Sequence, residues 1–284
     1  MITAIDHIAL AVRDLDAAVD GYRRLLGREP NWLGGDGGAR HAWFQLDNMA
    51  LDIITPDGAG AFGDVIRAHL QRHGEGIWAI AFTASDVAAA VKQLARRGVR
   101  ASEPGPTRST HIDGRKRYWT TSSLNPDDAG GVQILLVDPP RDGQPWPRSP
   151  ASGEAAVQAL DHVVIHTHHP DRALGLYGAK LGIDLRVDRT VAAAGARMLF
   201  FTCGGAVVEI VSELNPVSVT QIDRCDGLAW RVGDAAATQA RLLAAGLEPS
   251  DVRSGRKPGS KVFTVREGVV GAPTLIIEQG VRAA

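Results

Sequence analysis

The chain contains the same sequence pattern twice. Residues 5–27 read IDHIALAVRDLDAAVDGYRRLLG, and residues 160–182 read LDHVVIHTHHPDRALGLYGAKLG. The two stretches align without a gap, so that His162 falls on His7, and they share Asp, His, Ala, Tyr, Leu and Gly at matching places. Self-similarity of this kind indicates repeated structural units, and it constrains the fold more strongly than any local pattern does.

Each copy predicts a strand followed by a helix. Residues 5–12 are mostly apolar, Asp14 follows, apolar residues then recur at helical spacing, and Gly27 ends the stretch. This order is typical of a strand, a helix N-cap, an amphipathic helix and a glycine stop. Further strand-like runs follow at 30–33, 40–46 and 49–55, separated by turn residues. The predicted unit is therefore βαβββ.

The chain also contains two further, more divergent copies, so the unit occurs four times. They occupy residues 77–98 and 226–246, where Asp86 and Asp234 take the helix-start position of Asp14. A unit this small cannot bury a sheet face alone, so we expect units to close in pairs. The predicted fold class is α+β, with four βαβββ modules forming two domains whose curved sheets enclose cup-shaped cavities.

A proline-rich segment divides the two predicted domains. Residues 139–153 hold five prolines and no periodic pattern, which predicts an extended linker over 139–157. The predicted domains and their modules are 1–138 (modules 1–57 and 74–138) and 158–284 (modules 158–215 and 222–284).

Composition limits the classes of partner. The 31 basic and 32 acidic side chains nearly cancel, so neither nucleic acid nor a membrane surface is expected as a partner. We expect a small-molecule substrate and a monomer or homodimer. The first residues, MITAIDHIALAV, resemble no signal peptide, and no apolar run is long enough to cross a bilayer, so we expect a cytoplasmic protein. Cys203 and Cys225 have no metal-type spacing and do not imply a disulfide framework.

These motifs resemble the vicinal oxygen chelate superfamily, which includes glyoxalase I, methylmalonyl-CoA epimerase, extradiol dioxygenases and bleomycin-resistance proteins. The first copy carries the pattern DHIALAVxDLxxAVxxYxxLLG. Residues 74–82 (GEGIWAIAF) and 130–139 (GGVQILLVDP) are similar to the second module of the epimerase. The resemblance covers nearly the whole chain outside the linker and implies a glyoxalase-like fold, but it does not fix a reaction.

The resemblance also implies candidate ligands for a divalent metal ion. In metal-dependent members the ligands lie on the first and last strand of each module. Carried over by position, these are His7 with Asp52 and His162 with Glu209. The matching positions of the second and fourth modules hold residues that cannot bind a metal, namely Ala79, Leu135, Gly227 and Leu275. No nucleotide cofactor is expected.

Each half thus offers only one histidine and one carboxylate, which leaves several interpretations open. If modules pair in chain order, each cup holds one imidazole and one carboxylate, whereas a catalytic ion in such a fold prefers three or four ligands. If modules 1 and 3 share one cup, His7, Asp52, His162 and Glu209 form a full set. The pairs are alternatively relics of a metal site, or a histidine with a carboxylate that acts as a general base without metal.

Other residues are candidates for binding a substrate. Loops 112–119 (IDGRKRYW) and 254–263 (SGRKPGSKVF) recur at equivalent places and join glycine to Arg-Lys, which favours anion recognition by Arg115, Arg256 and Lys257. His166 lies four residues after His162, on the same predicted sheet face. Trp230, like Trp43 and Trp78, lies in a strand run and either lines a cup or packs in the core.

Two classes of function fit the sequence. The first is a glyoxalase-like enzyme, of isomerase or lyase type, that removes a proton next to a carbonyl of a small anionic oxygenated substrate. His162 and Glu209 are its candidate catalytic residues. The second is a non-catalytic binding or resistance protein with metal-free cavities. An extradiol-type dioxygenase fits less well, because Gly227 and Leu275 stand where that resemblance requires ligands.

Overall fold

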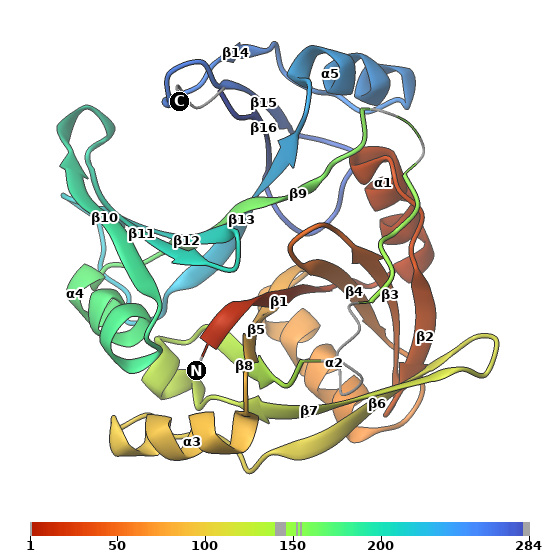
Figure 1. Ribbon diagram of the computed structural model, residues 1–284, viewed down its shortest axis with the longest axis vertical. Coiled ribbons are helices and arrows are strands. Elements are labelled where there is room, and N and C mark those ends of the chain that lie inside the picture. Colours follow the sequence, from red (N-terminus) through yellow and green to blue (C-terminus); the bar gives the residue numbers. More distant parts are fainter. Residues whose placement is uncertain (1, 140–145, 152, 154, 281–284) are drawn as a thin grey trace.

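A computed structural model describes residues 2–139, 146–151, 153 and 155–280. The chain folds into two eight-stranded sheets, one from each half of the sequence, with helices packed on their outer faces (Figure 1). The first sheet is a closed barrel, and the second curves into an open half-barrel between its edge strands β10 and β14. The predicted α+β class and the glyoxalase-like pairing of repeated modules are confirmed.

The first half consists of two consecutive βαβββ modules. Its elements are β1 (Ile2–Ala11), α1 (Leu15–Leu26), β2 (Trp32–Asp36), β3 (Ala39–Gln45), β4 (Ala50–Pro56), α2 (Ala61–His73), β5 (Gly76–Ala84), α3 (Val87–Arg96), β6 (Gly105–His111), β7 (Lys116–Ser123), η1 (Pro126–Ala129) and β8 (Gln133–Val137). The barrel order is β1-β4-β3-β2-β6-β7-β8-β5. Asp14 caps α1 by accepting the Ala17 N–H, and Gly27 ends the helix at a φ of 61°, as predicted. Helix α2 joins the two modules and was not predicted.

The second half repeats this plan. Its elements are β9 (Ala159–His166), α4 (Pro170–Ala173), the π-helix η2 (Leu174–Lys180), β10 (Asp184–Val191), η3 (Ala192–Ala194), β11 (Ala196–Cys203), β12 (Ala206–Glu213), β13 (Arg224–Val232), α5 (Ala235–Ala244), β14 (Arg253–Ser254), β15 (Lys261–Val265) and β16 (Thr274–Glu278). The sheet order is β10-β11-β12-β9-β13-β16-β15-β14.

Glycines close the first barrel. Strand β2 pairs with β6 through Gly34 and Gly35, and a Cβ atom at Gly34 would collide with the carbonyl oxygen of Thr110 on β6. In the second half the corresponding edge is β10, which has no glycine and is exposed along nearly its whole length. The opposite edge, β14, has only two residues. The second sheet stays open because neither edge offers a surface that the other can approach.

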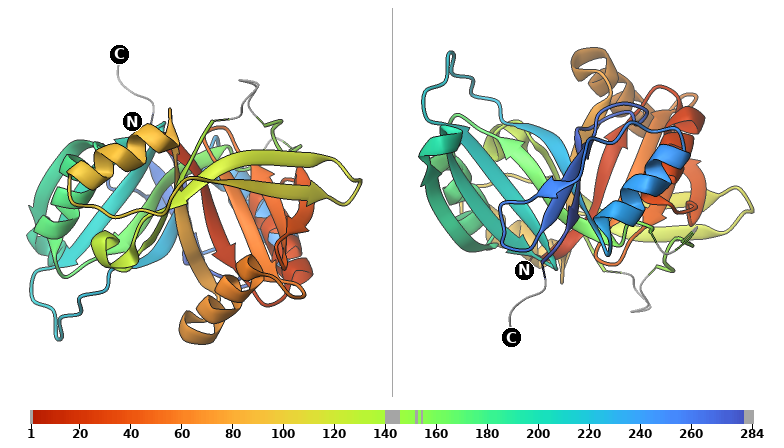
Figure 2. Two further views of the ribbon diagram at one scale, coloured as in Figure 1. Left: turned by 90° about the horizontal axis from the view of Figure 1, so that it is seen from below. Right: turned by 90° about the horizontal axis from the view of Figure 1, so that it is seen from above.

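The modules pair in chain order, so the interpretation that modules 1 and 3 share one cup is wrong. The outer faces of both sheets and their helices instead form one continuous hydrophobic core. Helix α5 packs beside α1 (Figure 2), where Arg241 donates to the Arg24 and Leu25 carbonyls at 2.5 and 2.8 Å. Likewise Arg97 donates to the Lys180 carbonyl at 2.6 Å.

The described part of the proline-rich segment packs on the first barrel. Arg28 donates to the carbonyl oxygens of Ser149 at 2.8 Å and Val157 at 2.6 Å, and Ser149 is almost completely buried. Residues 140–145, 152 and 154 of the predicted linker lie outside the described residues. None of the helices in the described part of the chain is both long enough and apolar enough to cross a membrane.

Candidate functional site

A β-bulge places an aspartate beside the repeated histidine in both halves. The pairing of β1 with β5 skips Asp6, and that of β9 with β13 skips Asp161. An extra residue in one strand turns two consecutive side chains toward the same side. Asp6 Oδ1 therefore lies 2.6 Å from His7 Nδ1, and Asp161 Oδ1 lies 2.9 Å from His162 Nδ1. The repeated Asp-His pair was visible in the sequence, but the aspartate received no role.

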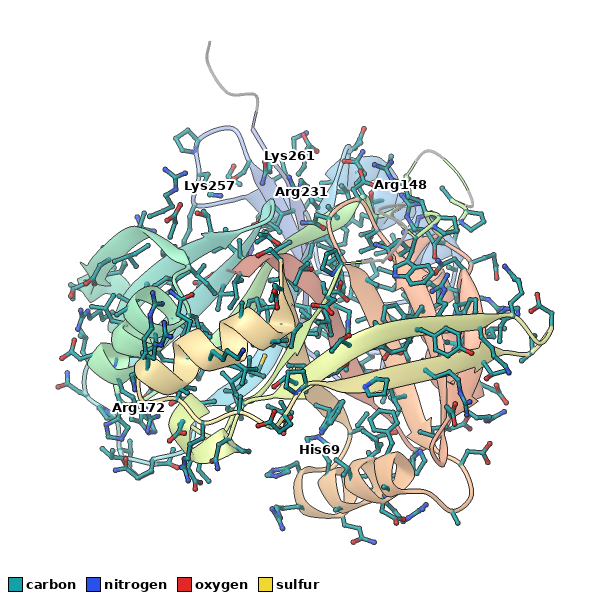
Figure 3. The ribbon with its side chains drawn as sticks, turned by 60° about the horizontal axis from the view of Figure 1, so that its bottom comes forward. His69, Arg148, Arg172, Arg231, Lys257 and Lys261 are labelled. Atoms are coloured by element: carbon teal, nitrogen blue, oxygen red, sulfur yellow. The ribbon has the colours of Figure 1, made fainter. Side chains whose placement is uncertain are left out.

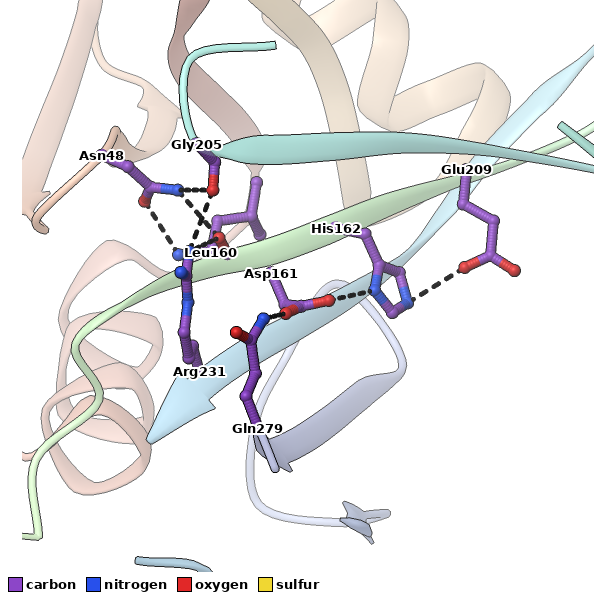
Figure 4. Close-up of polar contacts among 8 residues, drawn as sticks. All are labelled: Asn48, Leu160, Asp161, His162, Gly205, Glu209, Arg231 and Gln279. Carbon is purple, nitrogen blue, oxygen red and sulfur yellow. Dashed lines mark hydrogen bonds and ion pairs between the residues drawn. The ribbon is translucent and has the colours of Figure 1, made fainter. Parts of the chain in front are cut away.

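In the second half the histidine lies between two carboxylates. Figure 4 shows His162 with Asp161 on one side and Glu209 on the other. His162 Nε2 is 3.2 Å from Glu209 Oε2, and Gln279 donates to the far oxygen of Asp161 at 2.5 Å. The side chains of His162 and Glu209 are 15% and 10% exposed, so a part of each reaches the surface of the sheet. Both ring nitrogens can donate to these carboxylates only when the ring carries both protons.

The surroundings keep Asp161 ionised. Burial alone would raise the pKa of this carboxyl, but the hydrogen bond and charge of His162, the hydrogen bond from Gln279 and the charge of Lys257 outweigh it. The pKa of Asp161 therefore lies below its usual value. The carboxylate of Asp161 orients the ring of His162 through the hydrogen bond at Nδ1.

In the first half, the carboxylate at the position of Glu209 is Asp52, and it makes different contacts. Asp52 lies 3.2 Å from Nδ1 of His41, a nitrogen that also accepts the Trp43 indole N–H at 2.9 Å. His41 Nε2 lies 2.5 Å from the hydroxyl oxygen of Ser109. Aspartate is one methylene shorter than glutamate, and the position that holds His41 here holds Met198 in the second half. The carboxylate therefore lies against His41 rather than reaching the repeated histidine as Glu209 does.

His7 has a raised pKa although it is buried. Burial alone would lower the pKa, but the hydrogen bond to Asp6 and the charges of Asp6 and Asp52 outweigh that effect. A raised pKa in the folded state adds stability below the unfolded value of 6.5, and this contribution is lost as the pH rises through the folded pKa.

The free energy of unfolding should therefore fall as the pH rises from the unfolded value of 6.5 through the raised pKa of His7, and replacing His7 by Gln should flatten this slope. Urea unfolding of both proteins at a series of pH values measures the difference. Identical slopes in the two proteins would contradict the assigned role of the Asp6–His7 pair.

A side chain from the first half braces the bulge of the second (Figure 4). Asn48, in the turn between β3 and β4, donates to the Leu160 carbonyl at 2.8 Å and accepts the Leu160 N–H at 3.0 Å. It thereby satisfies both backbone groups of the residue that precedes the bulged Asp161. Arg231 also donates to the Leu160 carbonyl, at 3.2 Å, and to that of Gly205, at 2.9 Å. The position of Asp161 beside His162 therefore depends on contacts between the two halves of the chain.

The predicted basic loop of the second half overhangs this site. Arg256 Nη1 lies 3.6 Å from the sulfur of Met198, which shares a sheet face with Glu209 on the neighbouring strand. Lys257 lies on the same loop (Figure 3), and its charge acts on Asp161.

Three other predicted residues lie elsewhere. Arg115 is in the exposed β6–β7 turn, where its Nε is 2.7 Å from Asp113 Oδ2. His166 shares the face of His162, but it lies at the far end of β9, where it lines a cleft of ≈ 880 Å³ between the two halves. Trp230 is fully buried in the core, so it is not available to contact a substrate.

The donor set does not fit a resident divalent ion. The two histidine–carboxylate pairs lie in separate halves, and the strands that face them carry Ala79 and Leu135 in the barrel and Gly227 and Leu275 in the open sheet. Among the described residues, no group of three or more His, Cys, Asp or Glu side chains is arranged so that it could hold a metal ion; Asp161, His162 and Glu209 contact one another instead. A first-row catalytic ion normally takes at least three protein ligands. We therefore derive no chemical step through a metal.

Fold and site together define a protein of four βαβββ modules, with an Asp-His pair on a bulged strand in each half. The chain belongs to the Glyoxalase/Bleomycin resistance protein/Dioxygenase superfamily, whose family model matches residues 6–118 and 161–264. The resemblance inferred from the sequence is confirmed.

Similar proteins include several enzymes. An ethylmalonyl-CoA/methylmalonyl-CoA epimerase of Cereibacter sphaeroides is 32% identical over 143 residues, covering 48% of this chain and 98% of the epimerase. A variant of 4-hydroxymandelate synthase from Streptomyces coelicolor has a TM-score of 0.73 at 16% identity and covers 100% of this chain and 95% of that protein. A Mn(II)-bound glyoxalase from Novosphingobium aromaticivorans has a TM-score of 0.64 at 15% identity, covering 98% of this chain and 82% of the glyoxalase. The last two establish the likeness of fold alone.

Proposed function

We propose that this protein is an enzyme that removes a proton next to the carbonyl group of a small anionic substrate, giving an isomerase or lyase reaction. The site is the open sheet of the second half. The observation that carries this proposal is the position of His162, whose two ring nitrogens lie 2.9 Å from Asp161 and 3.2 Å from Glu209. The acid, His162, lies beside the base, Glu209, and a third group, Asp161, orients the acid. Proton transfer requires such an arrangement.

In this mechanism Glu209 is the base. Its carboxylate takes the proton from the carbon, the electron pair of the C–H bond forms the carbon–carbon double bond of an enolate, and negative charge develops on the carbonyl oxygen. The ring N–H of His162 that faces Glu209 donates a hydrogen bond to that oxygen once Glu209 has taken the proton, and Asp161 holds the ring in place through its hydrogen bond to the other nitrogen. Return of the proton by Glu209 restores the substrate, whereas a proton delivered by water to the opposite face inverts the carbon. In a lyase reaction, a group on the adjacent carbon leaves with its bonding electron pair and a carbon–carbon double bond forms.

The overhanging loop supplies the recognition of negative charge. Arg256 and Lys257 lie above the face that carries Glu209, so an anionic group of the substrate can bind them while its carbonyl lies against His162. The epimerase relative, whose match lies in the first half of the chain, supports this chemistry for the repeated module in general, since inversion of a carbon beside a carbonyl breaks a C–H bond there. We infer an acyl-CoA thioester, an α-hydroxy acid or an α-keto acid as the substrate class.

Hydrogen exchange in heavy water tests the proposal. We expect the protein to exchange the carbon-bound proton next to the carbonyl of a compound from this class, measured by proton NMR on methylmalonyl-CoA, ethylmalonyl-CoA, pyruvate and lactate. Because no step passes through a metal, a chelator should leave the exchange rate unchanged.

Two outcomes of this test count against the proposal. If the folded protein binds one of these compounds without exchange, it is a binding protein rather than an enzyme. If the chelator abolishes exchange, and elemental analysis finds an ion that the His162→Ala variant lacks, the reaction depends on a metal.

A further inference from the structure

An arginine lies buried at the mouth of the first barrel, outside the site of the proposed reaction. Arg117 on β7 is 7% exposed, and its guanidinium lies between two indole rings, 4.0 Å from the centre of Trp32 and 3.9 Å from that of Trp146. Trp32 belongs to β2, whereas Trp146 belongs to the proline-rich segment. Both flat faces of the guanidinium are therefore covered, and only its edge remains for hydrogen bonding.

This guanidinium has no acidic partner within the part of the chain that the structure describes. Within the described residues, Arg117 forms no ion pair, and its Nε is buried without a hydrogen-bond partner. Burial lowers the pKa of Arg117 to about 10, and the nearby cation Arg115 lowers it as well. A buried charge without a partner is costly, and proteins normally pair it. The N–H groups of Arg117 are thus available to a ligand.

The edge of Arg117 faces a small cavity. The cavity measures ≈ 20 Å³, enough for about one water molecule, and its walls include Trp43, Ser109 and Trp119 beside the two stacking tryptophans. Two carboxylates also line it, but each already has donors. Asp6 accepts from His7, and Asp138 accepts the Val87 N–H at 3.0 Å. Neither of them neutralises Arg117.

We propose that the mouth of the first barrel is a second ligand site, which binds the carboxylate head of a small monocarboxylate through the edge of Arg117. Two N–H groups at the edge of a guanidinium point in the same direction and lie in one plane. They can therefore donate to the two oxygens of a planar carboxylate while both faces of the guanidinium remain stacked. The indole walls suit a short apolar tail. Because the cavity holds about one water molecule, binding of the ligand requires Trp146, which covers Arg117, to move outward. This site does not depend on the proposed reaction, because it lies in the other half of the protein.

Binding to the indole rings is measured directly. The chain has six tryptophans, and their indole N–H signals are resolved by ¹⁵N NMR of tryptophan-labelled protein. Addition of sodium acetate should shift the signals of Trp32 and Trp146 in a saturable way, whereas sodium chloride at equal ionic strength should not. Arg117→Met should weaken acetate binding at least tenfold, or about 1.4 kcal/mol, because it removes the hydrogen bonds of a charged group.

The neighbouring arginine provides the matched control. Arg115→Met removes a cation from the same hairpin. Arg115 is exposed and paired with Asp113, and it lies 5.6 Å from the centre of Trp32, so its loss should shift the Trp32 signal but weaken acetate binding much less than Arg117→Met does. Arg117→Lys keeps the positive charge but loses the two parallel N–H groups, so it should also weaken acetate binding. It serves in place of Arg117→Met if that variant does not fold. The proposal is overturned if acetate causes no saturable shift, if the Arg117 variants bind as tightly as the unchanged protein, or if inorganic phosphate binds as tightly as acetate.

Discussion

Replacing Glu209 by Gln should lower the rate of carbon–hydrogen exchange by about 10²–10⁴-fold, which is the usual contribution of a general base. Glutamine has nearly the same shape, so the sheet should fold as before, but its amide cannot take a proton. Substrate binding by Arg256 and Lys257 remains, so the loss should appear in kcat much more than in KM. Exchange measured by proton NMR, together with steady-state kinetics, separates the change in kcat from the change in KM.

A glutamate on the same strand serves as the control for this variant. Glu213 lies four residues along β12, on the same face but exposed and away from His162, so Glu213→Gln should retain the exchange rate. His162→Gln should resemble Glu209→Gln, since it removes the donor to the enolate oxygen. Full exchange activity in the Glu209→Gln variant would show that the base lies elsewhere.

Replacing Gly34 by Ala should destabilise the protein by about 1–3 kcal/mol, the usual cost of forcing extra atoms into a packed site. The new methyl group would meet the backbone oxygen of Thr110, which cannot rotate away as a flexible side chain could. Strand β2 must then move from β6, and the pairs that close the barrel are lost. Urea unfolding measures the change in stability.

A second glycine in the same barrel offers a matched comparison. A Cβ atom at Gly105, in β6, meets no atom within 4 Å, so Gly105→Ala should leave stability unchanged or raise it by about 0.4–1 kcal/mol. Hydrogen exchange of the β2 and β6 amides should speed up in the Gly34 variant alone. Equal stability of the two variants would contradict the account of why the first sheet closes.

The modules could be predicted because their signals are local and repeated. Asp14, Asp86 and Asp234 each accept a backbone N–H three residues on, as helix N-caps do. Helix α2 had no comparable start signal: it follows Gly60, which has no capping side chain, and it buries only three residues. Its contacts are with the end of the barrel, so its position depends on a structure that local patterns do not reveal.

The candidate site was predicted in part. His162 and Glu209 lie together, as their positions in the repeat indicated, and the loop with Arg256 and Lys257 lies over the same face, which the repeat did not indicate. Asp161 was missed because alternation along a regular strand would turn it away from His162. Only the bulge, which depends on pairing with β13, brings the two side chains together.

By itself, the sequence determined the four modules, their helix ends and the histidine–carboxylate positions, because each rests on contacts between residues near in the chain or on the comparison of one copy with another. Tertiary structure decided which modules share a sheet, which sheet closes, and which partner each carboxylate takes. Asp52 lies against His41 whereas Glu209 reaches His162, and Arg117 is buried between Trp32 and Trp146 while Arg115 is exposed. These outcomes depend on side-chain reach and strand register across the sheets, and such distances exist only once the strands have paired.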